Sequence, residues 1–382
     1  MKTSPLAFDY QSTTPCSPRV VEAMNPFWNE FWGNPSNRQN SLGLNASASI
    51  SIAREQLASF FKISPERLIF TSGATEANNL ALLGHARAQL YEKGRPGHVI
   101  TLSTEHHSVL EPLRQLKKEG FRVTELIPDL NGIISLETLI DAFEDDTFLV
   151  SIMAANNEIG VLQPIEEIAS LCKIRGVIFH SDYTQCFGNL PIEIDKLGVD
   201  LLSISGHKIY GPKGIGLLIM CNNCPLQPLQ WGGDQEHGLR AGTVPVPLVI
   251  GLAKAAEIAI EEMDMNVQNL RFLRDQLWKG LNLQIPDLVI NGSLDKRLPN
   301  NLNFTVLGVQ GSRLHKKLRL VLTCSSGSAC SNGYPSHVLM SLGRTIKEAE
   351  ASLRLSLGRE TTLNEVELAV EAISKVVKDL RT

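Results

Sequence analysis

The sequence contains no long apolar run and carries little excess charge. None of its hydrophobic stretches approaches the roughly 20 residues that a membrane-spanning helix needs. Residues 1–16, MKTSPLAFDYQSTTPC, lack the apolar core of a secretory signal. Lys and Arg number 36 against 40 Asp and Glu, without blocks of one sign. We therefore expect a cytoplasmic protein that binds neither nucleic acid nor membranes.

Cysteine is also scarce, with seven residues scattered over 382 positions. An odd, scattered set in a long chain favours reduced thiols over a disulfide framework. Cys221 and Cys224 have the spacing of a metal-ligand pair, but no second Cys or His pair follows at a matching distance. A closed zinc site needs four ligands, so no metal site is expected here. Cys172 and Cys324 are predicted core residues.

Short apolar runs alternate with helical patterns over the first two thirds of the chain. The helical patterns cover residues 76–94 and 165–176, and the runs cover residues 67–73, 98–104, 121–128, 148–155, 176–182, 201–205 and 214–220. Buried strands that alternate with helices predict an α/β fold with a mostly parallel seven-stranded sheet, covered on both faces. Ligands of such sheets bind at the carboxyl ends of the strands.

The last third of the chain changes character. A helical stretch at residues 248–281 leads to three apolar runs, 301–307, 318–324 and 353–358, which are predicted strands of a smaller sheet. Thr362 and Glu365 form a capping box before the last helix. We expect a large domain at 16–255 and a small α/β C-terminal domain at 256–382, on which the N-terminal arm 1–15 packs. The cleft between the domains is the expected ligand site.

Two polar residues end neighbouring predicted strands. Lys208 follows the strand 201–205 in the segment SGHKIYGPKGIG, and Asp182 ends the strand 176–182. A lysine near glycines is more often a solvated surface residue, and an aspartate at a strand end often caps the next helix. Together, a desolvated lysine for a Schiff base and a carboxylate for a pyridine nitrogen suit a pyridoxal phosphate site.

Two further strand ends point to the same edge of the sheet. The first predicted strand runs into TSGATEANN, where Ala74 and Thr75 open a helix whose N–H groups can hold a phosphate. The second runs into TEHHSVL, which places His106 or His107 at that edge, where a single histidine is more often structural. A phosphate cradle, an aromatic base, a pyridine partner and a lysine together favour pyridoxal phosphate chemistry.

The motifs, taken in order, resemble a known family. FTSGATEANNLAL, TEHHSVL, NNEIGVLQPI, HSDYTQ, SGHKIYGPKGIG, GGDQEHGLRAGT, SSGSAC and LRLSLGR are similar to those of the cysteine desulfurases, pyridoxal phosphate enzymes of the class V aminotransferase group. The resemblance covers nearly the whole chain and indicates the branch that carries the SSGSAC segment. It implies a homodimer with the fold-type I architecture of aspartate aminotransferase.

The resemblance also implies a role for each matching residue. The catalytic set would be Lys208, which holds the cofactor as a Schiff base, His106, which stacks on its ring and moves protons, and Cys330. Asp182 would pair with the pyridine nitrogen. The other cofactor contacts would be Gln185 and Asn157 at the phenolic oxygen, and Ala74, Thr75, Ser205 and His207 at the phosphate, with Thr243 reaching in from the partner subunit.

Substrate binding is assigned by the same resemblance. Arg354 would clamp the substrate carboxylate bidentately, with Asn157 beside it. Arg359, five residues on, is the competing candidate, although a surface role is expected for it. The substrate would be L-cysteine, converted to L-alanine. The physiological sulfur acceptor, an iron–sulfur scaffold or another sulfur carrier, is not specified.

Cys330 lies in SSGSACSNGYPSH, where small polar neighbours offer little to bury it. A thiolate that attacks the substrate sulfur and then carries a persulfide to an acceptor must be reachable from both. The alternative is a selenocysteine or cystine lyase of the same fold, in which Cys330 is dispensable. A non-enzymatic binding subunit is disfavoured because no catalytic position is lost.

Three positions depart from the family pattern. Asn40 stands where the family usually has His, and Gln11 and Ser12 replace the usual Asn-Ala pair before two threonines. We expect all three to lie near the entrance of the site, where they influence rate or substrate preference.

Overall fold

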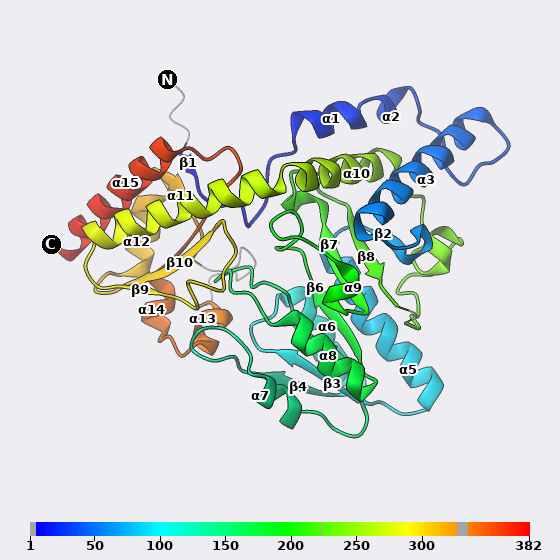
Figure 1. Cartoon of the computed structure of the whole chain (residues 1–382), viewed down its shortest axis with the longest axis horizontal. Helices are drawn as coiled ribbons and strands as arrows, with labels where there is room; N and C mark the ends of the chain where they lie inside the picture. Colours follow the sequence, from blue (N-terminus) through cyan, green and yellow to red (C-terminus); the bar gives the residue numbers. More distant parts are fainter. Residues whose placement is uncertain (1–4, 223, 327–334) are drawn as a thin grey trace.

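A seven-stranded sheet forms the centre of the larger part of the molecule (Figure 1). The computed structural model describes residues 5–222, 224–326 and 335–382. The strand order is β2-β8-β7-β6-β5-β3-β4; β8 pairs antiparallel with both β2 and β7, and the other neighbouring strands pair in parallel. Their bounds are β2 Leu68–Thr71, β3 His98–Leu102, β4 Arg122–Leu126, β5 Thr147–Ser151, β6 Ile178–Asp182, β7 Leu201–Ser205 and β8 Gly216–Met220. The predicted seven strands and their mostly parallel arrangement are confirmed.

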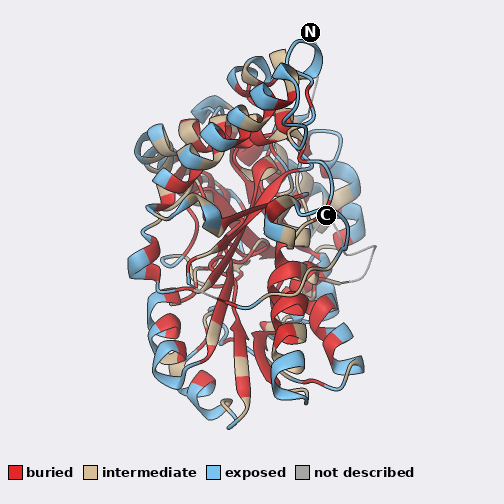
Figure 2. Cartoon of the chain, turned by 90° about the vertical axis from the view of Figure 1, so that its right-hand side faces the viewer, coloured by how far each residue is buried: buried red, intermediate tan, exposed pale blue. Residues whose placement is uncertain are grey.

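Helices cover the sheet, so its central strands are buried on both faces (Figure 2). Every residue of β3 and of β7 is buried, which explains why these strands read as continuous apolar runs. The helices of this part are α1 Pro18–Met24, α2 Pro26–Asn29, α3 Ser41–Phe61, α4 Ala74–Asn79, α5 His85–Lys93, α6 His107–Lys118, α7 Leu136–Asp141, α8 Ile165–Arg175, α9 Ile194–Leu197 and α10 Val246–Glu261. The predicted helix 76–94 is interrupted by one π-helical turn, Leu80–Gly84.

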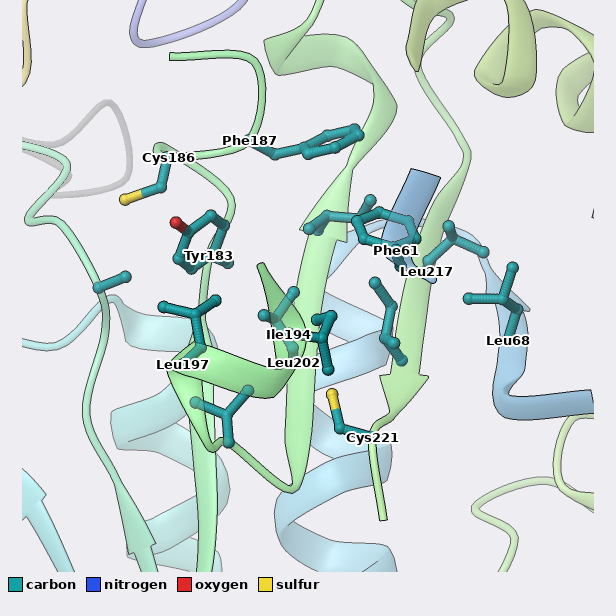
Figure 3. Packing of buried hydrophobic residues seen from close by; sticks show 14 of the residues in the cluster. Phe61, Leu68, Tyr183, Cys186, Phe187, Ile194, Leu197, Leu202, Leu217 and Cys221 are labelled. Atoms are coloured by element: carbon teal, nitrogen blue, oxygen red, sulfur yellow. The ribbon is translucent and has the colours of Figure 1, made fainter. Parts of the chain in front are cut away.

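One hydrophobic core lies between the sheet and the helices that include α3, α8 and α10. Figure 3 shows Leu202 of β7 and Leu217 of β8 among its side chains, with Cys221 just beyond β8. The rings of Phe61 and Phe187 pack there at a centroid distance of 5.4 Å. Cys221 is therefore a packed residue of this core.

A second core belongs to the C-terminal part. Its sheet has the order β12-β10-β9, and it is flanked by α11 and α15. Phe8 of the N-terminal arm is buried in this core. The bounds are β9 Leu288–Ile290, β10 Asn301–Val306, β12 Ser352–Ser356, α11 Met263–Gln284, α12 Gly311–Leu318, α13 His337–Ser341, α14 Ile346–Glu350 and α15 Leu363–Arg381. The capping box of Thr362 and Glu365 is confirmed at the start of α15. The division of the chain at residue 255 stays a prediction.

Two predictions for this part are wrong. The segment 318–324 is not a strand of the small sheet: α12 continues to Leu318, and the short β11 (Leu322–Thr323) pairs in parallel with β1 (Leu6–Ala7). The missing third strand is β9, which is only three residues long and half-buried, and so carries little apolar pattern. The helical stretch 248–281 is also not continuous, because Glu262 adopts φ −97° and ψ 0° between α10 and α11.

Candidate active site

A cavity of about 460 Å³ lies where β2, β3, β6 and β7 end, and the N-terminal arm and β12 close it. Ten of the predicted site residues line it: Ala74, Thr75, His106, Asn157, Asp182, Gln185, Ser205, His207, Lys208 and Arg354. They come from distant parts of the sequence and meet because parallel strands bring their carboxyl ends to one edge of the sheet. The roles expected of these residues stay predictions.

Lys208 stands in the short helical turn Gly206–Lys208 directly after β7. Its Nζ donates hydrogen bonds to two backbone carbonyl oxygens of the N-terminal arm, those of Gln11 and Ser12, the latter at 2.8 Å. The arm therefore positions the amine at the wall of the cavity. The side chain is half-buried, as a lysine nucleophile requires.

Asp182 is the last residue of β6 and is buried. Its Oδ2 accepts a hydrogen bond from Asn78 Nδ2 at 2.8 Å, and its Oδ1 accepts one from the backbone N–H of Thr184 at 3.0 Å. One donor on each oxygen fixes the plane of the carboxylate. The group thus faces the cavity in a defined orientation, as a partner for a pyridine nitrogen must.

His106 forms the N-cap of α6, and its Nδ1 accepts a hydrogen bond from the backbone N–H of Ser108 at 3.1 Å. A backbone N–H can only donate, so the proton of the neutral ring lies on Nε2. Ser108 Oγ is also 2.8 Å from Nδ1 and accepts from Asn78 Nδ2, which leaves its hydroxyl proton for Nδ1. Burial lowers the pKa of His106, and nearby Lys208 lowers it further, against the opposing effect of Asp182.

The turn between β2 and α4 forms one end of the cavity. Gly73 has φ +152°, a backbone conformation that residues with a side chain rarely adopt. A Cβ added there would lie 3.9 Å from Ser205 Oγ. Ala74 and Thr75 start α4 beside it, and His207 also lines the cavity. Burial, with Lys208 and Lys213 nearby, lowers the pKa of His207 to about 4, so its ring is neutral near pH 7.

Arg354 lies on β12 with its side chain only 2% exposed. Its Nη1 donates to the carbonyl oxygen of Asn157 at 2.8 Å, and its Nη2 donates to Asp9 Oδ1 at 2.6 Å and to Ser12 Oγ at 2.7 Å. Asp9 balances the buried charge, which would otherwise be costly. Within the described residues, Arg354 Nε and Asn157 Oδ1 are buried without a hydrogen-bond partner.

The donors and acceptors of this cavity fit pyridoxal phosphate. A lysine amine, a buried carboxylate and a strand-to-helix turn match the aldehyde, the pyridine nitrogen and the phosphate of that cofactor. Arg354 and Asn157 line this cavity, and each carries one buried polar atom without a hydrogen-bond partner within the described residues, Nε and Oδ1 respectively.

The remaining predicted residues lie elsewhere. Thr243 is exposed and does not line the cavity of its own chain, so its contribution to a partner subunit stays a prediction. Cys330 lies outside the described residues. Arg359 is not on the surface as expected: its side chain is 16% exposed, and its guanidinium lies 4.1 Å from the ring centre of Tyr210, outside this cavity.

The departures from the family pattern separate into two groups. Gln11 and Ser12 line the cavity, as expected. Asn40 does not line it in this chain; its Oδ1 caps α3 by accepting from the backbone N–H of Gly43 at 2.8 Å. The expectation that Asn40 lies near the entrance of the site stays a prediction.

The other cysteines are packing residues. Cys172, Cys221 and Cys224 are buried, which confirms the prediction for Cys172, and Cys324 is half-buried at the edge of the second core. Cys224 Sγ lies 3.2 Å from His85 Nδ1. Across residues 5–222, 224–326 and 335–382 there is no cluster of three or more metal-ligating side chains.

Sequence reasoning missed three residues that hold the site together: Asp9, Asn78 and Ser108. Asn78 stands four positions after Ala74, one helical turn along the same face, which is a signal that could have been used. Ser108 is the second helical residue after the His106 cap, where N-cap side chains find their partners. Asp9 gave no comparable signal, since its partner lies 345 positions away.

Comparison with known proteins identifies the family. The model of the family "Aminotransferase class-V" matches residues 6–368. The chain belongs to the class V aminotransferases. This family membership agrees with the predicted fold-type I architecture and with the observed sheet.

Similar proteins are known in sequence and in structure. The cysteine desulfurase IscS of Rickettsia akari (strain Hartford) is 44% identical over 383 residues, which cover 99% of this chain and 92% of the relative. The solved structure of a NifS-like protein superimposes with a TM-score of 0.91 at 35% identity, covering 99% of this chain and 100% of that one. That of SspA in complex with cysteine gives a TM-score of 0.81 at 36% identity, covering 94% and 100%.

As for membrane segments, none of the helices within the described ranges is long and apolar enough to cross a bilayer.

Proposed function

We propose that this protein is a cysteine desulfurase that uses pyridoxal phosphate to remove sulfur from L-cysteine, giving L-alanine and a persulfide on Cys330. The observation that carries the proposal is the convergence of Lys208, Asp182, His106 and Arg354 on one cavity. The likeness to IscS and to SspA, which was solved with cysteine, supports this choice within the family.

The chain's own groups define how the cofactor is held. Lys208 provides the amine that bonds its aldehyde carbon, and Asp182 provides the carboxylate that keeps the pyridine nitrogen protonated. The turn at Ala74 and Thr75, with Ser205 and His207, receives the phosphate. Bound in this way, pyridoxal phosphate supplies an electron sink for the charge left when a proton is removed from the substrate Cα.

The remaining steps belong to side chains of the protein. Arg354 binds the substrate carboxylate, and Lys208, once its amine is free, takes the Cα proton. The Cys330 thiolate attacks the substrate sulfur: a sulfur–sulfur bond forms and the Cβ–S bond breaks, with its electron pair passing to the three-carbon fragment. Protonation of that fragment completes L-alanine. His106 is neutral near pH 7 with its proton on Nε2, so it can exchange protons with the substrate.

The proposal includes the partners of the enzyme. We infer a homodimer in which Thr243 completes the phosphate site of the other subunit. The sulfur acceptor is a protein that takes sulfur from Cys330, either an iron–sulfur scaffold or a carrier for thio-modification. A cytoplasmic location stays a prediction.

The experiment that tests the function measures both products. Purified protein is given L-cysteine with and without a reductant, and alanine and sulfide are quantified beside a Cys330→Ala variant. Equal amounts of alanine and sulfur, together with an inactive variant, support the proposal. A variant that still releases sulfur, or turnover of selenocysteine or cystine alone, would favour a lyase of the same fold instead.

A further inference from the structure

Ser12 contacts both Arg354 and Lys208 in the cavity. Its hydroxyl Oγ accepts a hydrogen bond from Arg354 Nη2 at 2.7 Å, and its carbonyl oxygen accepts one from Lys208 Nζ at 2.8 Å. The residue is half-buried and lines the cavity. One residue thus contacts both the arginine expected to bind the substrate carboxylate, through its hydroxyl, and the lysine expected to carry the cofactor, through its backbone carbonyl oxygen.

The geometry of the guanidinium limits how Arg354 can bind a carboxylate. A guanidinium pairs with a carboxylate bidentately through either of two edges, Nε with Nη2 or Nη1 with Nη2. Both edges include Nη2, and its two hydrogens are directed at Asp9 and Ser12. Asp9 does not line the cavity, whereas Ser12 does. A carboxylate that enters from the cavity therefore meets the Ser12 hydroxyl at the Nη2 position.

The hydroxyl has a proton left to donate. Oγ uses a lone pair to accept from Arg354, and a hydroxyl that accepts one hydrogen bond still carries its own O–H donor. Its acceptance from a cation strengthens that donor, because hydrogen bonds in a chain polarise one another. The Nε of Arg354 is buried and has no hydrogen-bond partner within the described ranges.

We propose that Ser12 is a substrate-binding residue. Its hydroxyl, polarised by the hydrogen bond from Arg354, donates a hydrogen bond to the carboxylate of the amino-acid substrate. The inference rests on the proposed function in taking the substrate to be an amino acid whose carboxylate binds at Arg354. It assigns to Ser12 a contact that the small residue usual at this position of the family does not make.

The test compares two ligands that differ only in the carboxylate. L-Alanine, which has no thiol to react, and ethylamine, which is L-alanine without its carboxylate, are titrated into the cofactor-loaded protein by calorimetry and visible absorbance. We expect Ser12→Ala to weaken L-alanine binding by roughly tenfold, the size of one hydrogen bond to a charged group. Ethylamine binding should stay within about twofold because it cannot use that bond. Ser12→Thr, which keeps the hydroxyl, should restore L-alanine binding.

Three results would overturn the proposal. Unchanged L-alanine binding in Ser12→Ala would mean that the hydroxyl takes no part. Tighter binding would mean that the hydroxyl competes with the substrate for Arg354. Equal weakening of both ligands would place the effect on Lys208 and not on the carboxylate. If the native protein binds L-alanine in a Ser12-dependent way but releases no sulfur from L-cysteine, the inference holds and the proposed desulfurase function fails.

Discussion

Asn78 Nδ2 lies 2.8 Å from Asp182 Oδ2 and 2.8 Å from Ser108 Oγ, so one buried amide joins the carboxylate at the end of β6 to the hydroxyl that contacts His106. Both hydrogens of the amide are used, and each partner is itself buried. Asn78 therefore sets the orientation of two predicted cofactor contacts at once, without being expected to touch the substrate.

Replacing Asn78 with Ala should impair both cofactor binding and turnover. The loss of a hydrogen bond to a charged group is worth about 1.5–3 kcal/mol, so we expect cofactor affinity and kcat each to fall roughly tenfold or more. Cofactor affinity is measured by absorbance after dialysis, and kcat by alanine formation. Asn79→Ala is the matched control, because the Asn79 amide bonds the Thr75 carbonyl of its own helix and not Asp182. Equal behaviour of the two variants would contradict the positioning role.

Gly216 on β8 lies directly against the turn between β2 and α4. A Cβ added at Gly216 would lie 2.7 Å from the Cα and carbonyl carbon of Gly73 and 2.6 Å from the carbonyl oxygen of Ile204. Backbone atoms cannot move aside cheaply, so Gly216→Ala should displace the turn that carries Ala74. We expect about 1–3 kcal/mol less stability and a clear loss of cofactor affinity.

The control for this prediction separates strain from displacement. Gly94 has φ +69°, and no atom lies within 4 Å of a Cβ built on it. Gly94→Ala should therefore cost only about 1–2 kcal/mol of backbone strain and leave cofactor affinity unchanged. Thermal unfolding and cofactor titration of both variants provide the measurement. Unaltered cofactor binding in Gly216→Ala would show that the turn tolerates the added atom.

The part of the site that could be predicted from sequence depends on the sheet. Lys208 and Asp182 could be placed together because neighbouring parallel strands end at the same edge, a rule that needs only the apolar runs. The pairing of Asp9 with Arg354 could not be predicted, because the two residues lie 345 positions apart, one in the N-terminal arm and the other on β12. The error at 318–324 has a similar origin: the pattern of Leu318, Leu320 and Leu322 suits a strand, but α12 extends to Leu318 and leaves Leu320 77% exposed.

A buried ion pair anchors the loop that leads to Thr243. Arg54 Nη2 lies 2.5 Å from Glu236 Oε1, with side chains 15% and 3% exposed, and Glu236 Oε2 accepts from the backbone N–H of Phe70 at 2.8 Å. Glu236 holds this position despite a left-handed φ of 49°. The pair therefore connects α3, β2 and the loop.

Glu236→Ala leaves the Arg54 charge buried without its partner. We expect a loss of about 3 kcal/mol or more in the free energy of unfolding, measured by urea denaturation. Glu193→Ala is the control, because its pair with Lys196 has side chains 51% and 67% exposed and should contribute less than about 1 kcal/mol. If Glu236→Ala is as stable as Glu193→Ala, the attraction between Arg54 and Glu236 does not exceed the cost of desolvating the two charges.

His180 predicts how stability depends on pH. Its ring lies inside the sheet, with Nδ1 2.9 Å from Ser151 Oγ of β5 and Nε2 3.0 Å from Ser203 Oγ of β7. Burial lowers its pKa to about 4, against the opposing effect of Asp182. Between this value and the unfolded value of about 6.5, the unfolded chain binds a proton that the native protein does not. The stabilisation is thus complete above pH 6.5 and is lost as pH falls toward 4, by up to about 1.4 kcal/mol per pH unit.

His180→Asn removes the group to which the unfolded chain binds this proton, and it keeps a polar side chain between Ser151 and Ser203. The variant should be less stable at pH 7, but its free energy of unfolding should fall less steeply between pH 6.5 and 4.5, by about one proton in the linkage slope. Urea denaturation at a series of pH values measures that slope. His237→Asn serves as the control: its ring is exposed, and φ at this residue is 59°, which Asn tolerates, so the slope should be retained. An unchanged slope in His180→Asn would mean that another buried histidine, such as His85 or His207, whose pKa is also lowered by burial, governs acid sensitivity.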